Sequence, residues 1–228
     1  MALGLKSKDV KMGFRWQEEE RSVSVEYAEK LYNRFSIFYD LIYGLKVFNH
    51  GRELAPDYLD LFPEAQLLEV GVGTGLAIPP LPRNIEITAI DFSQKMLNRT
   101  RKRLHSLGIH NVQLFKMDAT HLGFPDNSFD RILAAYFIST VPNPVKVILE
   151  MKRVCRPGGY LVFLNHFKCE VPVIGSIEER LSPIFYRLGF NTGLNLQELM
   201  EQTGLDVESV EKIDALGHFK AVRCINRA

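Results

Sequence analysis

A glycine-rich turn between two apolar runs constrains this chain more than any other feature. Residues 67–75 read LLEVGVGTG, so Gly71, Gly73 and Gly75 directly follow a short apolar run. Glycines remove the Cβ atoms that would hold a ligand away, and they let backbone N–H groups face a polar ligand. Asp91 closes the next apolar run, twenty residues after Gly71. Dinucleotide-binding folds place the acid that binds the ribose hydroxyls at this spacing. The pattern therefore predicts a nucleotide-handling loop between two parallel strands.

Two details of this loop favour a ligand other than NAD. Leu76 departs from the G-x-G-x-x-G spacing that suits a pyrophosphate. Glu69 lies in an otherwise apolar strand, where a carboxylate is costly to bury unless it receives hydrogen bonds. The pattern E-x-G-x-G-x-G with a downstream acid resembles motif I of the class I S-adenosylmethionine-dependent methyltransferases. That resemblance implies S-adenosyl-L-methionine as the methyl donor and S-adenosyl-L-homocysteine as the product.

Further motifs of the same family follow in the expected order. Asp118 and Ala119 close a third apolar run, where the family uses an Asp-Ala pair to recognise adenine. Residues 124–130 (FPDNSFD) lead into a fourth strand, and residues 153–159 (RVCRPGG) resemble the family's R-V-L-x-P-G-G turn, with Cys155 as the one departure. Four motifs in the right order are more specific than any single one.

The resemblance covers roughly residues 50–228 and implies which residues bind the donor. They lie in and after the glycine loop, at the end of the second strand and at the end of the third strand. The set comprises Glu69, Gly71, Gly73, Thr74, Gly75, Asp91, Phe92, Met96, Asp118 and Ala119.

Composition sets the scale of the protein and excludes several functions. With 228 residues the chain can form one α/β core plus an appendage. Its 28 Lys and Arg nearly balance its 27 Asp and Glu, which gives no argument for nucleic-acid binding. Cys155, Cys169 and Cys224 lack metal-ligand spacing, so we expect no metal site, a reduced compartment and buried thiols.

We also expect a cytoplasmic protein without a transmembrane helix. The longest mainly apolar run, residues 132–141, is far shorter than the roughly 20 residues that span a bilayer. The N-terminus has no apolar segment and no cleavage site typical of a secretory signal.

Short apolar runs alternate with helical patterns from residue 66 onward, which predicts a doubly wound α/β fold with a mostly parallel sheet. The expected strands are residues 66–70, 85–90, 112–117, 131–135, 160–164, 207–213 and 219–225. The last two are expected to form a hairpin, and the family plan has seven strands with the last one antiparallel. Ser93 and Asn143 are N-caps for helices over residues 94–107 and 145–154. Three prolines within residues 79–82 limit the helix after the glycine loop to a turn or two.

The N-terminal 50 residues are expected to form a helical lid, and residues 51–228 the donor-binding domain. Tyr32, Phe35, Tyr39 and Tyr43 recur at helical spacing and form an aromatic stripe. Core packing explains such a stripe, and for Phe35 it is the favoured interpretation. Tyr39 is the best catalytic candidate, because an aromatic ring beside a sulfonium stabilises its charge by about 0.5–2 kcal/mol.

A second catalytic candidate is His166, directly after the fifth strand. If the acceptor is an amine, it must lose a proton before it attacks, and a neutral histidine can accept that proton. The same histidine could instead orient a phosphate or cap backbone groups, and these alternatives stay open.

The first 16 residues combine basic and apolar side chains. Lys6, Lys8, Lys11 and Arg15 against Asp9 give a net charge of +3. This composition is typical of an anchor at an anionic membrane surface, where each basic side chain contributes about 1 kcal/mol. A disordered or tag-derived terminus has the same composition.

A narrower resemblance suggests the acceptor. Residues 32–35, 39–44, 48–52, 165–167, 181–183 and 187–190 are similar to the bacterial phosphatidylethanolamine N-methyltransferases of the Rhodobacter type. The resemblance implies stepwise methylation of the headgroup amine towards phosphatidylcholine, by an enzyme held peripherally at the inner membrane surface. It implies that Tyr32, Arg180 and Arg187 bind the substrate, with Lys168 as a weaker candidate. A quinone-biosynthesis C-methyltransferase, a soluble small-molecule methyltransferase and a non-catalytic binding protein remain as alternatives.

Overall fold

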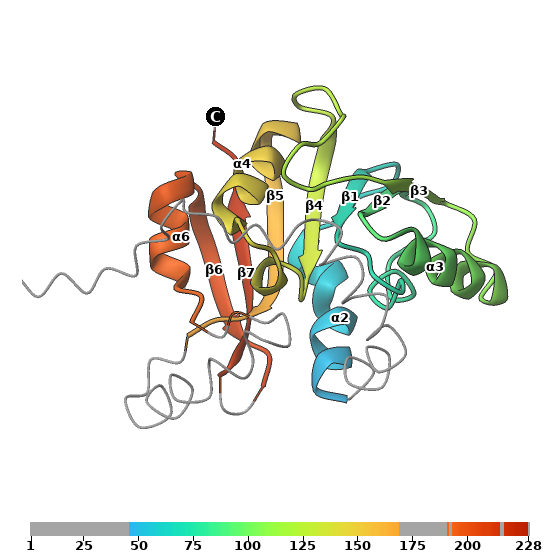
Figure 1. Cartoon of the computed structure of the whole chain (residues 1–228), viewed down its shortest axis with the longest axis horizontal. Coiled ribbons are helices and arrows are strands. Elements are labelled where there is room, and N and C mark those ends of the chain that lie inside the picture. Colours follow the sequence, from blue (N-terminus) through green and yellow to red (C-terminus); the bar gives the residue numbers. More distant parts are fainter. Residues whose placement is uncertain (1–45, 169–190, 192, 215–216, 228) are drawn as a thin grey trace, which may run out of the picture.

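The computed structural model describes residues 46–168, 191, 193–214 and 217–227. These residues form one seven-stranded sheet with the order β3-β2-β1-β4-β5-β7-β6 (Figure 1). The strands are β1 (Gln66–Val70), β2 (Glu86–Asp91), β3 (Val112–Lys116), β4 (Phe129–Ala135), β5 (Cys155–His166), β6 (Asp206–Lys212) and β7 (Phe219–Ile225). The helices are α2 (Lys46–Leu59), α3 (Gln94–Ser106), η1 (Ile138–Thr140), α4 (Pro144–Val154) and α6 (Leu196–Thr203).

The sheet confirms the predicted doubly wound fold. Strands β1 to β5 pair in parallel, and β7 runs antiparallel to both β5 and β6. The strand order changes direction between β1 and β4. In open α/β sheets a ligand binds at such a switch point, outside the carboxyl ends of the strands.

Local chemistry explains where two of the helices start. The Ser93 hydroxyl accepts a hydrogen bond from the Met96 N–H at 3.3 Å and caps α3. The Asn143 side chain accepts from the Lys146 N–H at 2.9 Å, and Pro144 occupies the first turn of α4. Both caps satisfy N–H groups that have no partner within the helix.

The expectation of a short helix after the glycine loop is wrong. Residues 71–85 form turns and bends without a helical segment. Pro79, Pro80 and Pro82 lack the N–H groups that a helix would use, and the Leu81 N–H instead donates to the Ile78 carbonyl at 3.0 Å. The segment is held by burial, because Ile78 and Leu81 are almost inaccessible.

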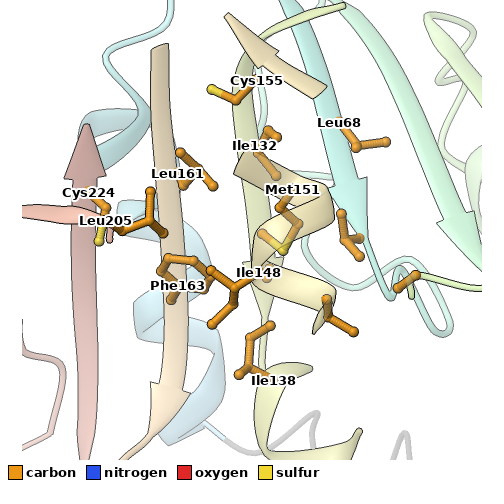
Figure 2. Close-up of a cluster of buried hydrophobic side chains, with 14 of the residues drawn as sticks. Leu68, Ile132, Ile138, Ile148, Met151, Cys155, Leu161, Phe163, Leu205 and Cys224 are labelled. Atoms are coloured by element: carbon orange, nitrogen blue, oxygen red, sulfur yellow. The ribbon is translucent and has the colours of Figure 1, made fainter. Parts of the chain in front are cut away.

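Helices cover both faces of the sheet. Side chains of α4 and α6 pack on one face, and those of α2 and α3 pack on the other. Figure 2 shows Ile148 and Met151 of α4 lying against Ile132 and Phe163 of the sheet. Each fully buried side chain of this size contributes about 1.5–3 kcal/mol to folding.

Two of the three cysteines belong to this core. Cys155 and Cys224 are fully buried, and burial raises the pKa of each thiol to about 12. The expected burial is therefore confirmed for these two, whereas Cys169 lies outside the described residues.

Helix α2 is fastened to the sheet at its carboxyl end. The Arg131 guanidinium of β4 donates to the Leu59 carbonyl at 2.6 Å and to the Asp60 carbonyl at 3.1 Å. It also stacks on the Phe62 and Tyr160 rings, at 5.2 and 4.7 Å from their centroids. These contacts satisfy carbonyls at a helix end that have no partner within the helix. Helix α2 runs through residue 50, and the division into a lid and a donor-binding domain stays a prediction.

In the described part of the chain, no helix has the length and apolarity needed to cross a membrane.

Candidate active site

The glycine loop leaves β1 at the switch point and closely approaches its neighbours. Gly71, Gly73 and Gly75 all have positive φ, at 74°, 56° and 78°. A Cβ atom on Gly71 would lie 2.1 Å from the Phe137 ring, and one on Gly75 would lie 2.8 Å from Thr100. Glycine is required here both for the backbone conformation and for the space.

Asp91 braces this loop from the end of β2. Its carboxylate accepts hydrogen bonds from the Gly73 N–H at 2.9 Å and from the Ser93 N–H at 2.8 Å. Burial raises the pKa of Asp91 to about 6, although both hydrogen bonds act in the opposite direction. A carboxylate has about four lone-pair sites, so Asp91 can also accept from two ribose hydroxyls.

Glu69 is a buried carboxyl group in the middle of the site. Its side chain is 2% exposed, and Oε2 has no hydrogen-bond partner among the described residues. Burial raises its pKa to about 8; the nearby Arg52 opposes this rise and Asp91 adds to it. A buried polar atom without a partner is costly, so this position fits a ligand that brings a hydrogen-bond donor or a positive charge.

A pocket opens beside Glu69. Its walls come from α2, β1, the glycine loop and the end of β4: Arg52, Glu69, Gly71, Val72, Thr74, Leu76, Ala77 and Ala135. Sequence reasoning gave no role to Arg52. The available signal was the resemblance over residues 48–52, which includes Arg52 but gave it no role.

The other residues that were predicted to bind the methyl donor lie at the same edge of the sheet. The Met117 N–H donates to the Asp91 carbonyl at 3.0 Å, which places Asp118 beside the end of β2. Asp118 is exposed, and one of its oxygens accepts from the Thr120 N–H at 2.8 Å; Ala119 is buried.

Three further expected residues differ in their surroundings. Thr74 is buried in the loop, where its backbone carbonyl and its hydroxyl both accept hydrogen bonds from Arg103. Phe92 is partly buried directly after β2. Met96 is 2% exposed in the first turn of α3, so plain packing explains it as well as donor binding does.

A second group of predicted residues lies at the carboxyl ends of β4 and β5. His166 ends β5, with its ring 5.5 Å from the Phe219 ring and 6.1 Å from the His218 ring. Tyr136 follows β4, and its N–H donates to the carbonyl of Leu164 in β5 at 2.6 Å. His166 thus lies at the carboxyl edge of the sheet, as predicted.

Several predicted residues lie outside the described residues, namely Tyr32, Tyr39, Arg180 and Arg187. Lys168 is described: its side chain is exposed, and its N–H donates to the Leu194 carbonyl at 2.9 Å.

The fold and the site together define a doubly wound α/β protein built to hold a nucleoside. The glycine cradle accommodates a polar ligand, Asp91 suits a ribose, and the unpaired oxygen of Glu69 suits a cationic group. S-Adenosylmethionine carries a ribose, an ammonium and a sulfonium, so the residues present fit this donor.

Comparisons with known proteins agree. A profile of the methyltransferase domain family matches residues 68–163. Phosphatidylethanolamine N-methyltransferase of Cereibacter sphaeroides is 33% identical over 202 residues, which are 88% of this chain and 98% of that protein. Demethylmenaquinone methyltransferase of Listeria welshimeri is 37% identical over 86 residues, which are 38% of this chain and 36% of that protein.

Among solved structures, the putative methyltransferase in a complex with the Haloferax volcanii Trm112 activator has a similar fold. Its TM-score is 0.71 at 14% identity, and the match covers 88% of this chain and 98% of that one. The chain belongs to the class I S-adenosylmethionine-dependent methyltransferases.

Proposed function

We propose that this enzyme methylates the headgroup amine of phosphatidylethanolamine and of its methylated intermediates, towards phosphatidylcholine. The observation that carries this proposal is the similarity to the Cereibacter sphaeroides enzyme, because it extends over 88% of this chain and 98% of that protein. Similarity confined to the donor-binding half would say little about the acceptor.

In the proposed reaction the bound donor supplies a methyl group on a sulfonium. A new N–C bond forms as the S–C bond breaks, and the S–C electron pair returns to sulfur. The protein then needs no covalent nucleophile, so positioning provides much of the catalysis. Asp91 holds the ribose, and Asp118 and Ala119 lie on the adenine side.

The acceptor must be neutral when it attacks, so its ammonium form first loses a proton, since an ammonium has no lone pair with which to attack. We assign His166 as the base that removes this proton, directly or through water, because it lies at the carboxyl end of β5. Tyr39 is assigned beside the sulfonium, and Tyr32, Arg180 and Arg187 to the lipid headgroup. All four of these residues lie outside the described part of the chain.

The distribution of charge favours an anionic surface as the place of action. Residues 94–117, which include α3 and β3, contain six basic residues and no acid. Residues 193–214, which include β6, contain six acids and one lysine. β3 and β6 are the two edge strands (Figure 1). An anionic bilayer would therefore attract the α3 edge of the protein and repel the β6 edge.

The reaction is tested with vesicles that contain phosphatidylethanolamine and with S-adenosylmethionine. Mass spectrometry should find mono-, di- or trimethylated lipid, and the Asp91→Ala variant should form much less of it. A methylated quinol in place of methylated lipid would favour the quinone alternative. That alternative has weaker support, because the match to the Listeria welshimeri enzyme covers only 38% of this chain.

The membrane orientation has its own test. Arg101→Glu combined with Lys102→Glu reverses two exposed charges on α3. It should reduce binding to vesicles that contain phosphatidylglycerol, since each basic side chain near such a surface contributes about 1 kcal/mol. Glu198→Lys combined with Glu201→Lys, two exposed acids on α6, is the matched control; equal losses from both pairs would contradict the proposed orientation.

A further inference from the structure

We propose that Arg52 binds the α-carboxylate of the methyl donor and that Tyr136 holds the guanidinium in place for it. The inference rests on the donor assigned above and is independent of which acceptor is methylated.

Arg52 is a buried cation placed in the wall of the pocket. It lies on α2, is 4% exposed, and lines the same cavity as Glu69. Its Nη1 donates to the Asn49 side chain at 3.2 Å, which fixes one edge of the guanidinium. A guanidinium presents five N–H donors in a planar fork that matches a carboxylate with two parallel hydrogen bonds.

The charges that line the pocket select one end of the donor. Its lining combines one cation, Arg52, with one acid, Glu69. The nucleoside end of S-adenosylmethionine is uncharged, whereas its amino-acid end carries an ammonium and a carboxylate. Glu69 Oε2, which lacks a partner among the described residues, is therefore matched to the ammonium, and Arg52 to the carboxylate.

Tyr136 joins α2 to the sheet at this point. Its hydroxyl donates to the Phe48 carbonyl at 3.0 Å, and the Arg52 guanidinium carbon lies 5.1 Å from its ring centroid. Burial raises the pKa of Tyr136 to about 12, so the hydroxyl remains a donor at any ordinary pH. The helix can approach because a glycine faces it: a Cβ atom on Gly51 would lie 2.6 Å from the tyrosine oxygen.

The backbone of Tyr136 is strained in this arrangement. Its φ is +57°, which is uncommon for a residue other than glycine and typical of sites where strain serves a function. The turn places the Tyr136 ring against Arg52 and the following Phe137 ring against Gly71. One strained residue thus positions both the cation and the wall of the glycine loop, which makes Tyr136 a positioning residue.

The test compares two ligands on several variants by isothermal titration calorimetry, without any acceptor. The ligands are S-adenosylmethionine and decarboxylated S-adenosylmethionine, which keeps the sulfonium and the amine but lacks the carboxylate. Arg52→Met should weaken S-adenosylmethionine binding roughly 10- to 100-fold and change the affinity for the decarboxylated ligand by less than about threefold. The affinity of Arg52→Lys for S-adenosylmethionine should lie between those of the unchanged protein and Arg52→Met, because lysine keeps the charge but lacks the planar fork of N–H donors.

The controls separate this role from a structural one. Arg83→Met removes a guanidinium that donates to the Leu81 and Pro79 carbonyls, and it should leave both affinities unchanged. In Tyr136→Leu, the ratio of the affinity for S-adenosylmethionine to that for the decarboxylated ligand should fall. Tyr136→Phe keeps the ring and should retain most of this ratio. If Tyr136→Leu does not fold, the comparison of Arg52→Lys with Arg52→Met still decides the question.

Two outcomes would overturn the inference. Equal losses for both ligands would show that Arg52 only supports the pocket. Unchanged binding of S-adenosylmethionine together with a raised KM for lipid would assign Arg52 to the acceptor instead. Failure of the lipid reaction alone would not contradict the role of Arg52 in donor binding, because the titrations contain no lipid.

Discussion

The loops after β1 and after β4 meet the same backbone demand in different ways. After β1, three glycines adopt positive φ, and the backbone itself lines the site. After β4, Tyr136 adopts φ +57° while its side chain is 2% exposed. Glycine suffices where the backbone must turn in little space. The N–H groups of Gly71, Gly73 and Gly75 are not bare, because they donate to the Ile90 carbonyl, the Asp91 carboxylate and the Val72 carbonyl. Where a side chain must be held in one orientation, glycine cannot serve, and the backbone of that residue carries strain of about 1–3 kcal/mol instead.

The largest effect should come from adding a methyl group to the loop after β1. Gly71→Ala combines a positive φ, which costs about 1–2 kcal/mol, with overpacking against Phe137, which costs about 1–3 kcal/mol. We expect the free energy of unfolding to fall by about 2–5 kcal/mol, measured by urea denaturation. Gly108→Ala is the matched control, because Gly108 has φ +62° with no atom within 4 Å of the added Cβ. Equal losses in both variants would mean that the contact with Phe137 has no cost.

A smaller effect is expected from the acid that braces this loop. Asp91→Ala removes the charged partner of the ribose and the acceptor for the Gly73 N–H. Affinity for S-adenosylmethionine should fall by about 1–3 kcal/mol, measured by calorimetry. Asp57→Ala, on the exposed side of α2, should leave affinity unchanged. Unaltered binding by Asp91→Ala would remove the assignment of this pocket to the donor.

The pH dependence of stability tests the buried carboxyl group next to the loop. The pKa of Glu69 is about 8 in the folded protein, against 4.5 for the ordinary side chain. Between these values the folded state binds a proton that the unfolded state releases, so stability falls as pH rises through this window. The slope approaches about 1.4 kcal/mol per pH unit for one group. Denaturation at pH 5.5, 7.0 and 8.5 should show a smaller slope for Glu69→Gln; identical slopes would mean that Glu69 is ionised in the unliganded protein.

The smallest effect concerns the strained tyrosine itself. Tyr136→Phe keeps the ring and the backbone but loses the hydrogen bond to the Phe48 carbonyl. The free energy of unfolding should fall by about 0.5–1.5 kcal/mol, measured by thermal and urea denaturation. A loss above that range would show that the hydroxyl, rather than the ring, is the main tie between α2 and the sheet.

The sequence predicted the sheet and the loop after β1 because their signals are local. Glycine spacing, a terminal acid and short apolar runs are sufficient to locate Gly71, Asp91 and the strands along the chain, whereas the seven-stranded plan came from the family resemblance. The role of Arg52 was missed because it depends on how α2 approaches the sheet, which no spacing encodes. A positive φ at a tyrosine cannot be predicted from the sequence either, because glycine is the residue type that signals this backbone conformation. His166 reached the predicted edge, but its role as a base stays a prediction, as do the roles of Tyr39 and Arg187.

The two buried thiols on β5 and β7 allow local opening of the protein to be measured. Cys155 and Cys224 are fully inaccessible, so a thiol reagent can modify them only when the structure opens around them. In a variant with Cys169 replaced by Ser, the rate of modification therefore measures how often these two positions open. Donor added during the reaction should slow it, in proportion to how far ligand binding tightens the strands that support the site.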